Sequence, residues 1–309
     1  MKGCSFLFPG QGAQYVGMGR ELVERFPECE DLLKRAELQL DLPLGKIMFS
    51  GPEERLHEDL NAQLAVYIVS CMVADLLASK PIRAATLAPY SSGIYGAAYG
   101  AGVIDFQTGL NLIVEVDRCI READSHGCMG VVLGLSLAEV EEMCQRVEGQ
   151  VEVSIVNTRH QIIVSGEHRA VNRLLKLAAD SEALKTDRLP AAAPYHCSLL
   201  TSADHCLAKK ISKISMNEPH TPILSYIDQK PLVKAAQVAQ LLSIQLRSQV
   251  QWLGVVEEMV RQNLSPMVEI GPGQMLGRTV RWIYRQTEVL NTDTTVALEQ
   301  TVKSLQNSN

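Results

Sequence analysis

Short apolar runs alternate along the chain with longer segments in which apolar residues recur every three or four positions. Runs of this kind are typical of buried strands, and the periodic segments are typical of helices packed on a sheet. The expected strands are 5–8, 84–88, 129–133, 151–156, 161–165, 184–189, 223–227 and 267–270, and the expected helices are 18–39 with a break near Pro27, 61–79, 92–100, 105–123, 137–147, 170–180, 199–211, 233–246, 252–262 and one ending at Trp282. The alternation predicts an α/β fold.

The pattern changes near Gly127, where the expected elements follow the order β-α-β-β-α-β. That order is typical of a ferredoxin-like unit. We therefore expect a small inserted ferredoxin-like α+β subdomain over residues 126–195. Residues 1–125 and 196–309 would form a large α/β-hydrolase-like domain with a parallel central sheet, and the tail 306–309 is expected to fray.

Composition excludes several classes of function. The 309 residues are 46% hydrophobic and 21% charged, as in an ordinary globular protein. The net charge of −6 and the lack of a Lys/Arg stripe argue against a nucleic-acid partner. The longest apolar stretch, 64–78, is interrupted by Ser70 and Asp75, so we expect no membrane span. The N-terminal apolar run is too short for a signal peptide, which favours the cytoplasm.

The eight cysteines are scattered singly and form no CxxC pair. This spacing fits neither a zinc site nor a disulfide framework. We therefore expect free thiols in a reducing compartment and no bound metal.

The first candidate for chemistry is Ser91, in the sequence Pro89-Tyr90-Ser91-Ser92-Gly93 between an expected strand and an expected helix. It is a variant of the G-x-S-x-G turn that exposes a nucleophilic serine, with proline in place of the first glycine. The alternative is a serine that only caps the following helix.

The second candidate is His196, which lies 105 positions after Ser91 in the sequence Ala193-Pro194-Tyr195-His196. A serine hydroxyl needs a base to become a nucleophile, and neutral imidazole suits that task near pH 7. A lone histidine is more often structural or exposed, as we expect for the other six. Together, the serine and the histidine predict acyl-transfer chemistry.

Two glycine-flanked turns, Gly10-Gln11-Gly12 and Gly271-Pro272-Gly273, follow expected strands. They are either tight connections or loops that aim a backbone N–H at a developing oxyanion. Neither matches a nucleotide-binding loop.

These segments, taken in order, resemble the malonyl-CoA:acyl-carrier-protein transacylase family over nearly the whole chain. The matching positions are Phe8–Gln14, Gln63, Ser91, 101–106, Asn157, 161–166, Ala193–His196 and Glu269–Gly273. Tyr90, the residue before the serine, is a feature in which the chain resembles the transacylase subunit of malonate decarboxylase.

The resemblance implies a ping-pong transfer from a coenzyme A thioester to an acyl carrier protein, with no bound cofactor. Ser91 would be the nucleophile and His196 its base, and the backbone N–H groups of Gln11 and Ser92 would form the oxyanion hole. A monomer is the family's default.

The resemblance also implies that a backbone carbonyl, rather than an acidic side chain, orients the histidine. By analogy we expect this carbonyl near Ser225 or Tyr226. Gln63, Tyr90 and Tyr195 would contact the substrate, and Tyr195 would favour an unbranched acyl group.

One departure from the family concerns the acyl group. The family's arginine that pairs with the malonyl carboxylate falls on Val116, which cannot form such a pair. Arg118 lies two positions further on, about 200° around a helix, so we expect it at the surface. The alternative is that the helix shifts and Arg118 binds the substrate carboxylate in place of the missing arginine. Malonyl is favoured as the acyl group, and acetyl or another short group stays possible.

Two other functions remain open. An α/β-type serine hydrolase or thioesterase has its base near the C-terminus, whereas 113 residues follow His196. A catalytically degenerate subunit that only binds a carrier protein would not need both Ser91 and His196.

Overall fold

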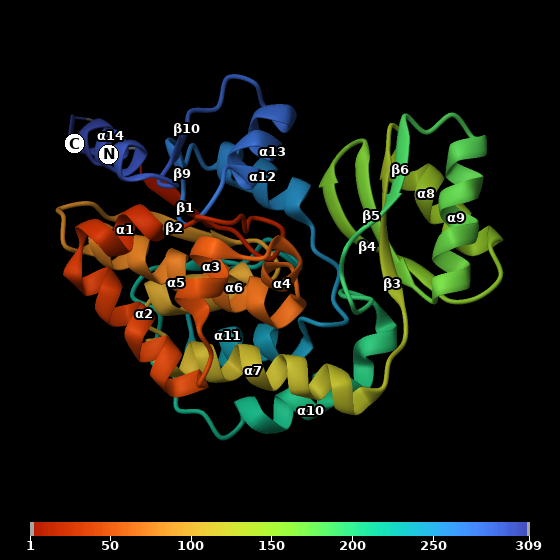
Figure 1. Cartoon of the computed structure of the whole chain (residues 1–309). Helices are drawn as coiled ribbons and strands as arrows, with labels where there is room; N and C mark the ends of the chain where they lie inside the picture. Colours follow the sequence, from red (N-terminus) through yellow and green to blue (C-terminus); the bar gives the residue numbers. More distant parts are fainter. Residues whose placement is uncertain (1–2, 308–309) are drawn as a thin grey trace.

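The computed structural model describes residues 3–307 and contains two separate sheets (Figure 1). The larger sheet has the order β10-β9-β1-β2-β7-β8. Its strands are parallel except for β8, which runs antiparallel to β7. The strands are β1 (Cys4–Phe8), β2 (Ala84–Pro89), β7 (Ile223–Leu224), β8 (Pro231–Leu232), β9 (Met267–Glu269) and β10 (Val289–Asn291).

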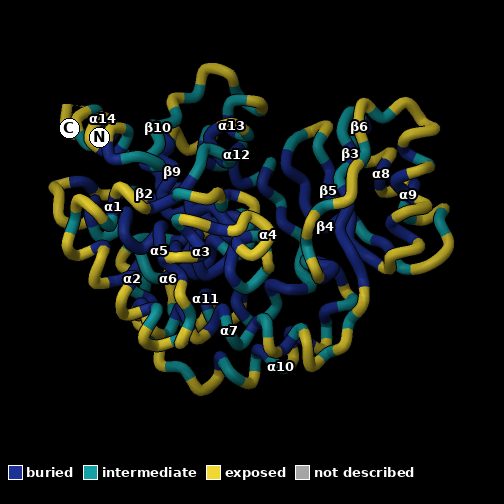
Figure 2. Tube along the Cα trace, viewed as in Figure 1, coloured by how far each residue is buried: buried dark blue, intermediate teal, exposed yellow. Residues whose placement is uncertain are grey.

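The helices around this sheet bury it on both faces, as a parallel sheet requires. They are α1 (Arg20–Arg25), α2 (Pro27–Leu40), α3 (Leu44–Ser50), α4 (Glu53–Leu56), α5 (Asp59–Ala78), α6 (Gly93–Gly100), α7 (Phe106–Ala123), η1 (Ser198–Leu200), α10 (Thr201–Ile211), α11 (Ala235–Ile244), α12 (Trp252–Arg261), α13 (Met275–Ile283) and α14 (Thr295–Asn307). The residues of the central strands β1 and β9 and of helix α5 are mostly buried, whereas the edge strands β6 and β10 are exposed or half-buried (Figure 2).

Helix α5 is long and apolar enough, by length and composition alone, to cross a membrane. The sequence analysis did not expect this. However, 83% of its apolar window is buried inside the fold. The helix is therefore explained as the central core helix of the large domain.

The smaller sheet is antiparallel, with the order β4-β5-β3-β6. With its two helices it forms the β-α-β-β-α-β unit that the sequence predicted, and it has a hydrophobic cluster of its own. The elements are β3 (Cys128–Leu133), α8 (Leu137–Arg146), β4 (Val151–Thr158), β5 (Gln161–Gly166), α9 (His168–Asp180) and β6 (Lys185–Arg188). The expected subdomain boundaries, 125/126 and 195/196, fall in its two connections to the large domain.

The structure contains several elements that the sequence did not predict, most of them short. Helices α3, α4 and α14 and strands β8 and β10 were not expected, and β7 is shorter than the strand expected over 223–227. Helix α14 continues to Asn307, so the frayed tail expected over 306–309 is wrong for its first two residues, and its last two lie outside the described residues.

The expectation that all cysteines are free thiols is wrong for one pair. Cys119 on α7 and Cys206 on α10 form a disulfide, because these two helices pack side by side and bring the Cα atoms to 5.7 Å. The other six cysteines are free.

Candidate active site

Ser91 lies on a sharp turn between β2 and α6, as the sequence predicted. Its φ angle is 51°, in the left-handed region that side chains rarely adopt. Gly93 makes the turn possible, since a Cβ there would lie 2.1 Å from the Phe8 carbonyl oxygen. The helix-capping position belongs to Ser92, and its side chain makes no cap hydrogen bond. Ser91 therefore does not cap the helix, and strain at such a site is typical of function.

His196 meets Ser91 across the two halves of the large domain. Its Nε2 lies 2.7 Å from Ser91 Oγ, and the residue is only 4% exposed. Its φ of 60° is also in the left-handed region. The sequence predicted that the Ser91 hydroxyl and the His196 imidazole lie together, and the structure places them in contact.

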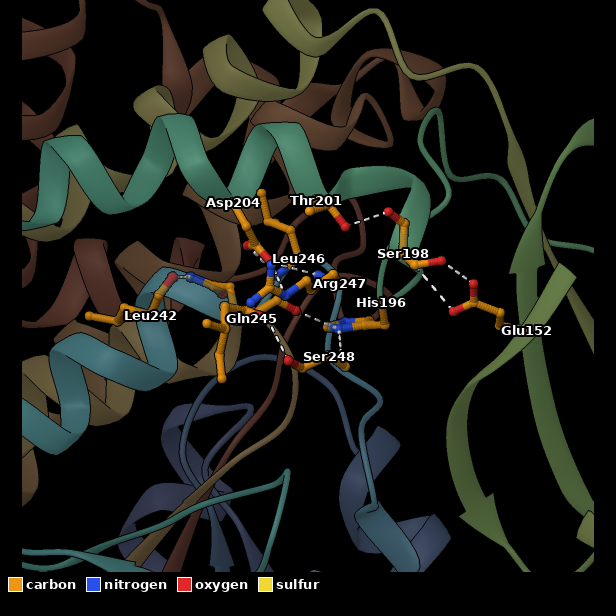
Figure 3. Close-up of polar contacts among 11 residues, drawn as sticks. Glu152, His196, Ser198, Thr201, Asp204, Leu242, Gln245, Leu246, Arg247 and Ser248 are labelled. Carbon is orange, nitrogen blue, oxygen red and sulfur yellow. Dashed lines mark hydrogen bonds and ion pairs between the residues drawn. The ribbon is translucent and has the colours of Figure 1, made fainter. Parts of the chain in front are cut away.

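Two backbone carbonyls hold the other ring nitrogen, His196 Nδ1: Gln245 O at 3.0 Å and Ser248 O at 2.9 Å (Figure 3). A carbonyl oxygen only accepts hydrogen bonds, so Nδ1 carries the proton and donates it. Nε2 is thereby left as an acceptor facing the Ser91 hydroxyl.

The expectation that Ser225 or Tyr226 supplies this carbonyl is wrong. Strand β7 ends at Leu224, and the chain then turns, with the Ser225 carbonyl accepting from the N–H of Gln229. The Tyr226 carbonyl accepts from the N–H of Gln251, while its ring packs edge-on against the imidazole. Both carbonyls are therefore engaged elsewhere.

Burial sets the protonation state of His196. It lowers the pKa of the imidazole from 6.5 to about 4, while the hydrogen bonds to the Ser248 and Gln245 carbonyls raise it. The imidazole is therefore neutral at pH 7 and able to accept a proton.

We expect the imidazole resonances of His196 to titrate with a midpoint near pH 4, measured by NMR on histidine-labelled protein. Because this pKa is lowered on folding, the contribution of His196 to stability is complete above pH 6.5 and is lost as the pH falls toward 4. A midpoint near 6.5 would mean that the imidazole is solvated and would contradict the buried geometry.

A cavity of about 170 Å³ opens beside Ser91 and His196. An apolar cavity of about 150 Å³ accepts a molecule the size of benzene, so a short acyl group fits. Its described lining contains no lysine or arginine. The lining includes Gln11, Gln63, Tyr90, Val116, Met129, Ile155, Ile163, Leu189, Tyr195 and Leu246.

The candidate substrate-contact residues Gln63, Tyr90, Val116 and Tyr195 line this cavity. Arg118 does not. Its side chain is 51% exposed, and it pairs with Glu122 at 2.7 Å and Glu115 at 3.6 Å. This agrees with its expected place at the surface.

Asp59, a carboxylate that hydrogen-bonds with two residues of the cavity lining, was not among the residues predicted from the sequence. It accepts from the Gln11 side chain at 2.6 Å and from the Tyr195 hydroxyl at 2.9 Å. Gln63 donates to the Gln11 side chain at 3.1 Å. Asp59 precedes Gln63 by four positions on α5, and that spacing, which places both on one helix face, was the available signal.

The two expected oxyanion donors lie together at the Ser91 turn. The N–H of Gln11 donates to Ser92 Oγ at 3.0 Å, so this hydroxyl must give way before Gln11 can bind an oxyanion. The other glycine turn has a structural explanation, because its N–H groups at Gly271 and Gly273 donate to Thr292 and Asp293.

Nothing in residues 3–307 gathers three or more histidine, cysteine, aspartate or glutamate side chains into a metal site.

A parallel α/β sheet with a strained serine turn and a buried, hydrogen-bonded histidine is typical of serine-nucleophile enzymes. The chain belongs to the acyl transferase domain family, whose model matches residues 5–306. This confirms the resemblance, the α/β fold and the acyltransferase class.

Similar proteins agree with this assignment. The chain is 26% identical to the malonyl CoA-acyl carrier protein transacylase of Bacillus subtilis strain 168, over 100% of this chain and 99% of that protein. It is 31% identical to that of Escherichia coli K12, over 88% and 90%.

Among solved structures, the malonyl CoA-acyl carrier protein transacylase from Coxiella burnetii matches with a TM-score of 0.94 and 29% identity, over 98% of each chain. A type II PKS acyl-carrier protein in complex with its malonyl-transacylase matches with a TM-score of 0.94 and 28% identity, over 98% of this chain and 99% of that one.

Proposed function

We propose that this protein moves a short acyl group from coenzyme A to the phosphopantetheine thiol of an acyl carrier protein. The observation that carries this proposal is the 2.7 Å contact between Ser91 Oγ and His196 Nε2 beside an acyl-sized cavity. The family assignment and the relatives named as transacylases support the transfer to a carrier.

In the first half-reaction, Ser91 Oγ attacks the thioester carbonyl while His196 Nε2 takes the hydroxyl proton. The C–S bond then breaks, coenzyme A leaves with that proton as its thiol, and the acyl group remains as an oxyester on Ser91. The backbone N–H groups of Gln11 and Ser92 would bind the oxyanion formed on the way.

In the second half-reaction, the phosphopantetheine thiol gives its proton to His196 and attacks the oxyester. The C–O bond breaks, the acyl group leaves as a new thioester, and the proton returns to Ser91 Oγ. The two carbonyls on Nδ1 stabilise the imidazolium that exists transiently in each half.

Malonyl is the favoured acyl group, because the relatives are named for malonyl-CoA. Acetyl or another short acyl group stays within the proposal, since Val116 supplies no cation. Tyr195 narrows the cavity beside the histidine and favours an unbranched group.

The proposed partners are an acyl-CoA and an acyl carrier protein, with the enzyme working as a monomer. A cytoplasmic location is supported by the six free thiols, which are typical of a reducing compartment, and by the use of coenzyme A as the acyl donor.

Intact-mass measurement after incubation with malonyl-CoA and with acetyl-CoA tests the proposal. We expect an adduct from at least one donor, mapped to Ser91 by peptide digestion and discharged by a carrier protein bearing phosphopantetheine. Rapid loss of the adduct to water would favour the hydrolase instead. Binding of the carrier without any adduct would favour the degenerate subunit.

A further inference from the structure

A carboxylate outside the cavity is bonded to the loop that holds His196. Asp204 lies in the first turn of α10 and is only 1% exposed. Its Oδ1 accepts from the N–H of Leu246 at 3.0 Å, and its Oδ2 accepts from the N–H of Arg247 at 3.1 Å. Figure 3 shows the side chain pointing from α10 at this loop. One carboxylate thus binds two successive peptide groups.

Those two peptide groups carry carbonyls that contact His196. A trans peptide unit is planar, with its N–H and its carbonyl pointing in opposite directions. The unit that bears the Leu246 N–H also bears the Gln245 carbonyl, which accepts from His196 Nδ1 at 3.0 Å. The unit that bears the Arg247 N–H also bears the Leu246 carbonyl, which accepts from the His196 backbone N–H at 2.6 Å.

We propose that Asp204 is a positioning residue for the base, because it fixes the orientation of both peptide planes whose carbonyls hold the side chain and the backbone of His196. The inference rests on the serine–histidine pair of the proposed function and does not depend on the identity of the acyl group. Asp204 does not line the cavity, so it acts through the backbone of residues 245–247, which holds His196.

The strain at His196 explains why an anchor is needed. A residue other than glycine at a φ of 60° persists only where its surroundings hold it. Asp204 follows His196 by eight positions, through η1 and into α10, and then bonds back to the loop that the imidazole contacts. Asp204 therefore links the helix that follows His196 to the loop whose carbonyls bind His196.

The groups that face Asp204 are one cation and two phenols. Arg247 Nε lies 3.6 Å from Oδ2, and Tyr95 and Tyr226 are near enough for its charge to raise their pKa values. Burial raises the pKa of Asp204, while the hydrogen bonds from the two N–H groups and the charge of Arg247 lower it. Burial is the larger effect, and the resulting pKa is about 6. Protonation would replace one acceptor oxygen with an O–H and so disturb one of the two peptide planes.

The test measures how fast a fluorophosphonate probe labels Ser91, since that reaction needs the base but no acyl donor. Ser91 Oγ attacks phosphorus, fluoride leaves and His196 takes the proton. We expect the maximal labelling rate to fall about 100-fold in Asp204→Ala, as a misplaced catalytic group can cost. In Asp204→Asn, which retains one acceptor oxygen, we expect a fall of about 10-fold. The probe concentration at half-maximal rate should not change.

The matched control is Glu269→Gln. Glu269 is fully buried and also accepts from two successive N–H groups, those of Leu276 and Gly277, but their peptide units do not contact His196. We expect its labelling rate within threefold of the wild type. The labelling rate of the wild type should also fall as the pH drops through about 6, where Asp204 becomes protonated. The pH profile of Asp204→Asn should lack this fall near pH 6.

The inference is overturned if Asp204→Asn labels as fast as the wild type, if Glu269→Gln is slowed as much as Asp204→Ala, or if the step near pH 6 survives in Asp204→Asn. A wild type that the probe does not label overturns both the inference and the proposed function. A labelled wild type that forms no acyl adduct overturns the proposed function alone.

Discussion

Ser91→Ala is expected to form no covalent adduct with any acyl-CoA and to lose transfer to a carrier protein by about 10⁴-fold or more. Alanine has no Oγ to carry the acyl group, and His196 then has no hydroxyl to deprotonate. The neighbouring Ser92 cannot replace it, because its hydroxyl faces Gln11 and accepts from that residue's N–H. Intact mass after incubation with malonyl-CoA or acetyl-CoA measures the adduct, and a coupled assay measures transfer.

The matched control is Ser92→Ala, which removes the adjacent hydroxyl and keeps the nucleophile. It should still form the adduct, although its rate can change because the Gln11 N–H loses an acceptor. An adduct that persists in Ser91→Ala and disappears in Ser92→Ala would place the nucleophile one residue further along and would contradict the mechanism.

Much of the site could be predicted because its parts are encoded locally. The turn at Ser91 needs a strand, a helix and a small residue two positions on, and all three are visible in sequence. The small residue is required at Gly93 because any side chain there would collide with the Phe8 carbonyl. Val116 could also be placed, because the resemblance to the family continues without a gap from Ser91 through Phe106 into the helix that holds Val116.

The parts that could not be predicted depend on backbone groups and on tertiary contacts. Every residue has a carbonyl, so nothing in the sequence marks those of Gln245 and Ser248 as the ones that reach His196. Their position depends on a loop bonded to Asp204, which lies more than 40 residues away. The Cys119–Cys206 disulfide likewise depends on how two helices pack.

Within residues 3–307, the cavity offers no cationic side chain that could pair with the carboxylate of a malonyl group. None of the described residues that line it is a lysine or an arginine. From the sequence, we expect Val116 to take the place of the family's arginine. The carboxylate of Asp59, which accepts hydrogen bonds from the lining residues Gln11 and Tyr195, would repel a second carboxylate. We therefore expect the selectivity between malonyl and acetyl to depend on position 116.

Val116→Arg is expected to raise the ratio of malonyl to acetyl transfer by about 10- to 100-fold. Val116 is only 2% exposed and lines the cavity, so a guanidinium there can meet the acyl carboxylate away from bulk water. A hydrogen bond to a charged group is worth about 1.5–3 kcal/mol, which corresponds to this range. The ratio of the acylation rates of Ser91 by the two donors, followed by intact mass, measures the effect.

Two controls separate charge from volume and from other cations. Val116→Met fills the same space without charge and should leave the ratio unchanged. Arg118→Ala should also leave it unchanged, since that side chain is held at the surface by Glu122 and Glu115. A ratio that stays constant in Val116→Arg and drops in Arg118→Ala would instead identify Arg118 as the partner of the carboxylate, because only a cation already in use would make the new one redundant.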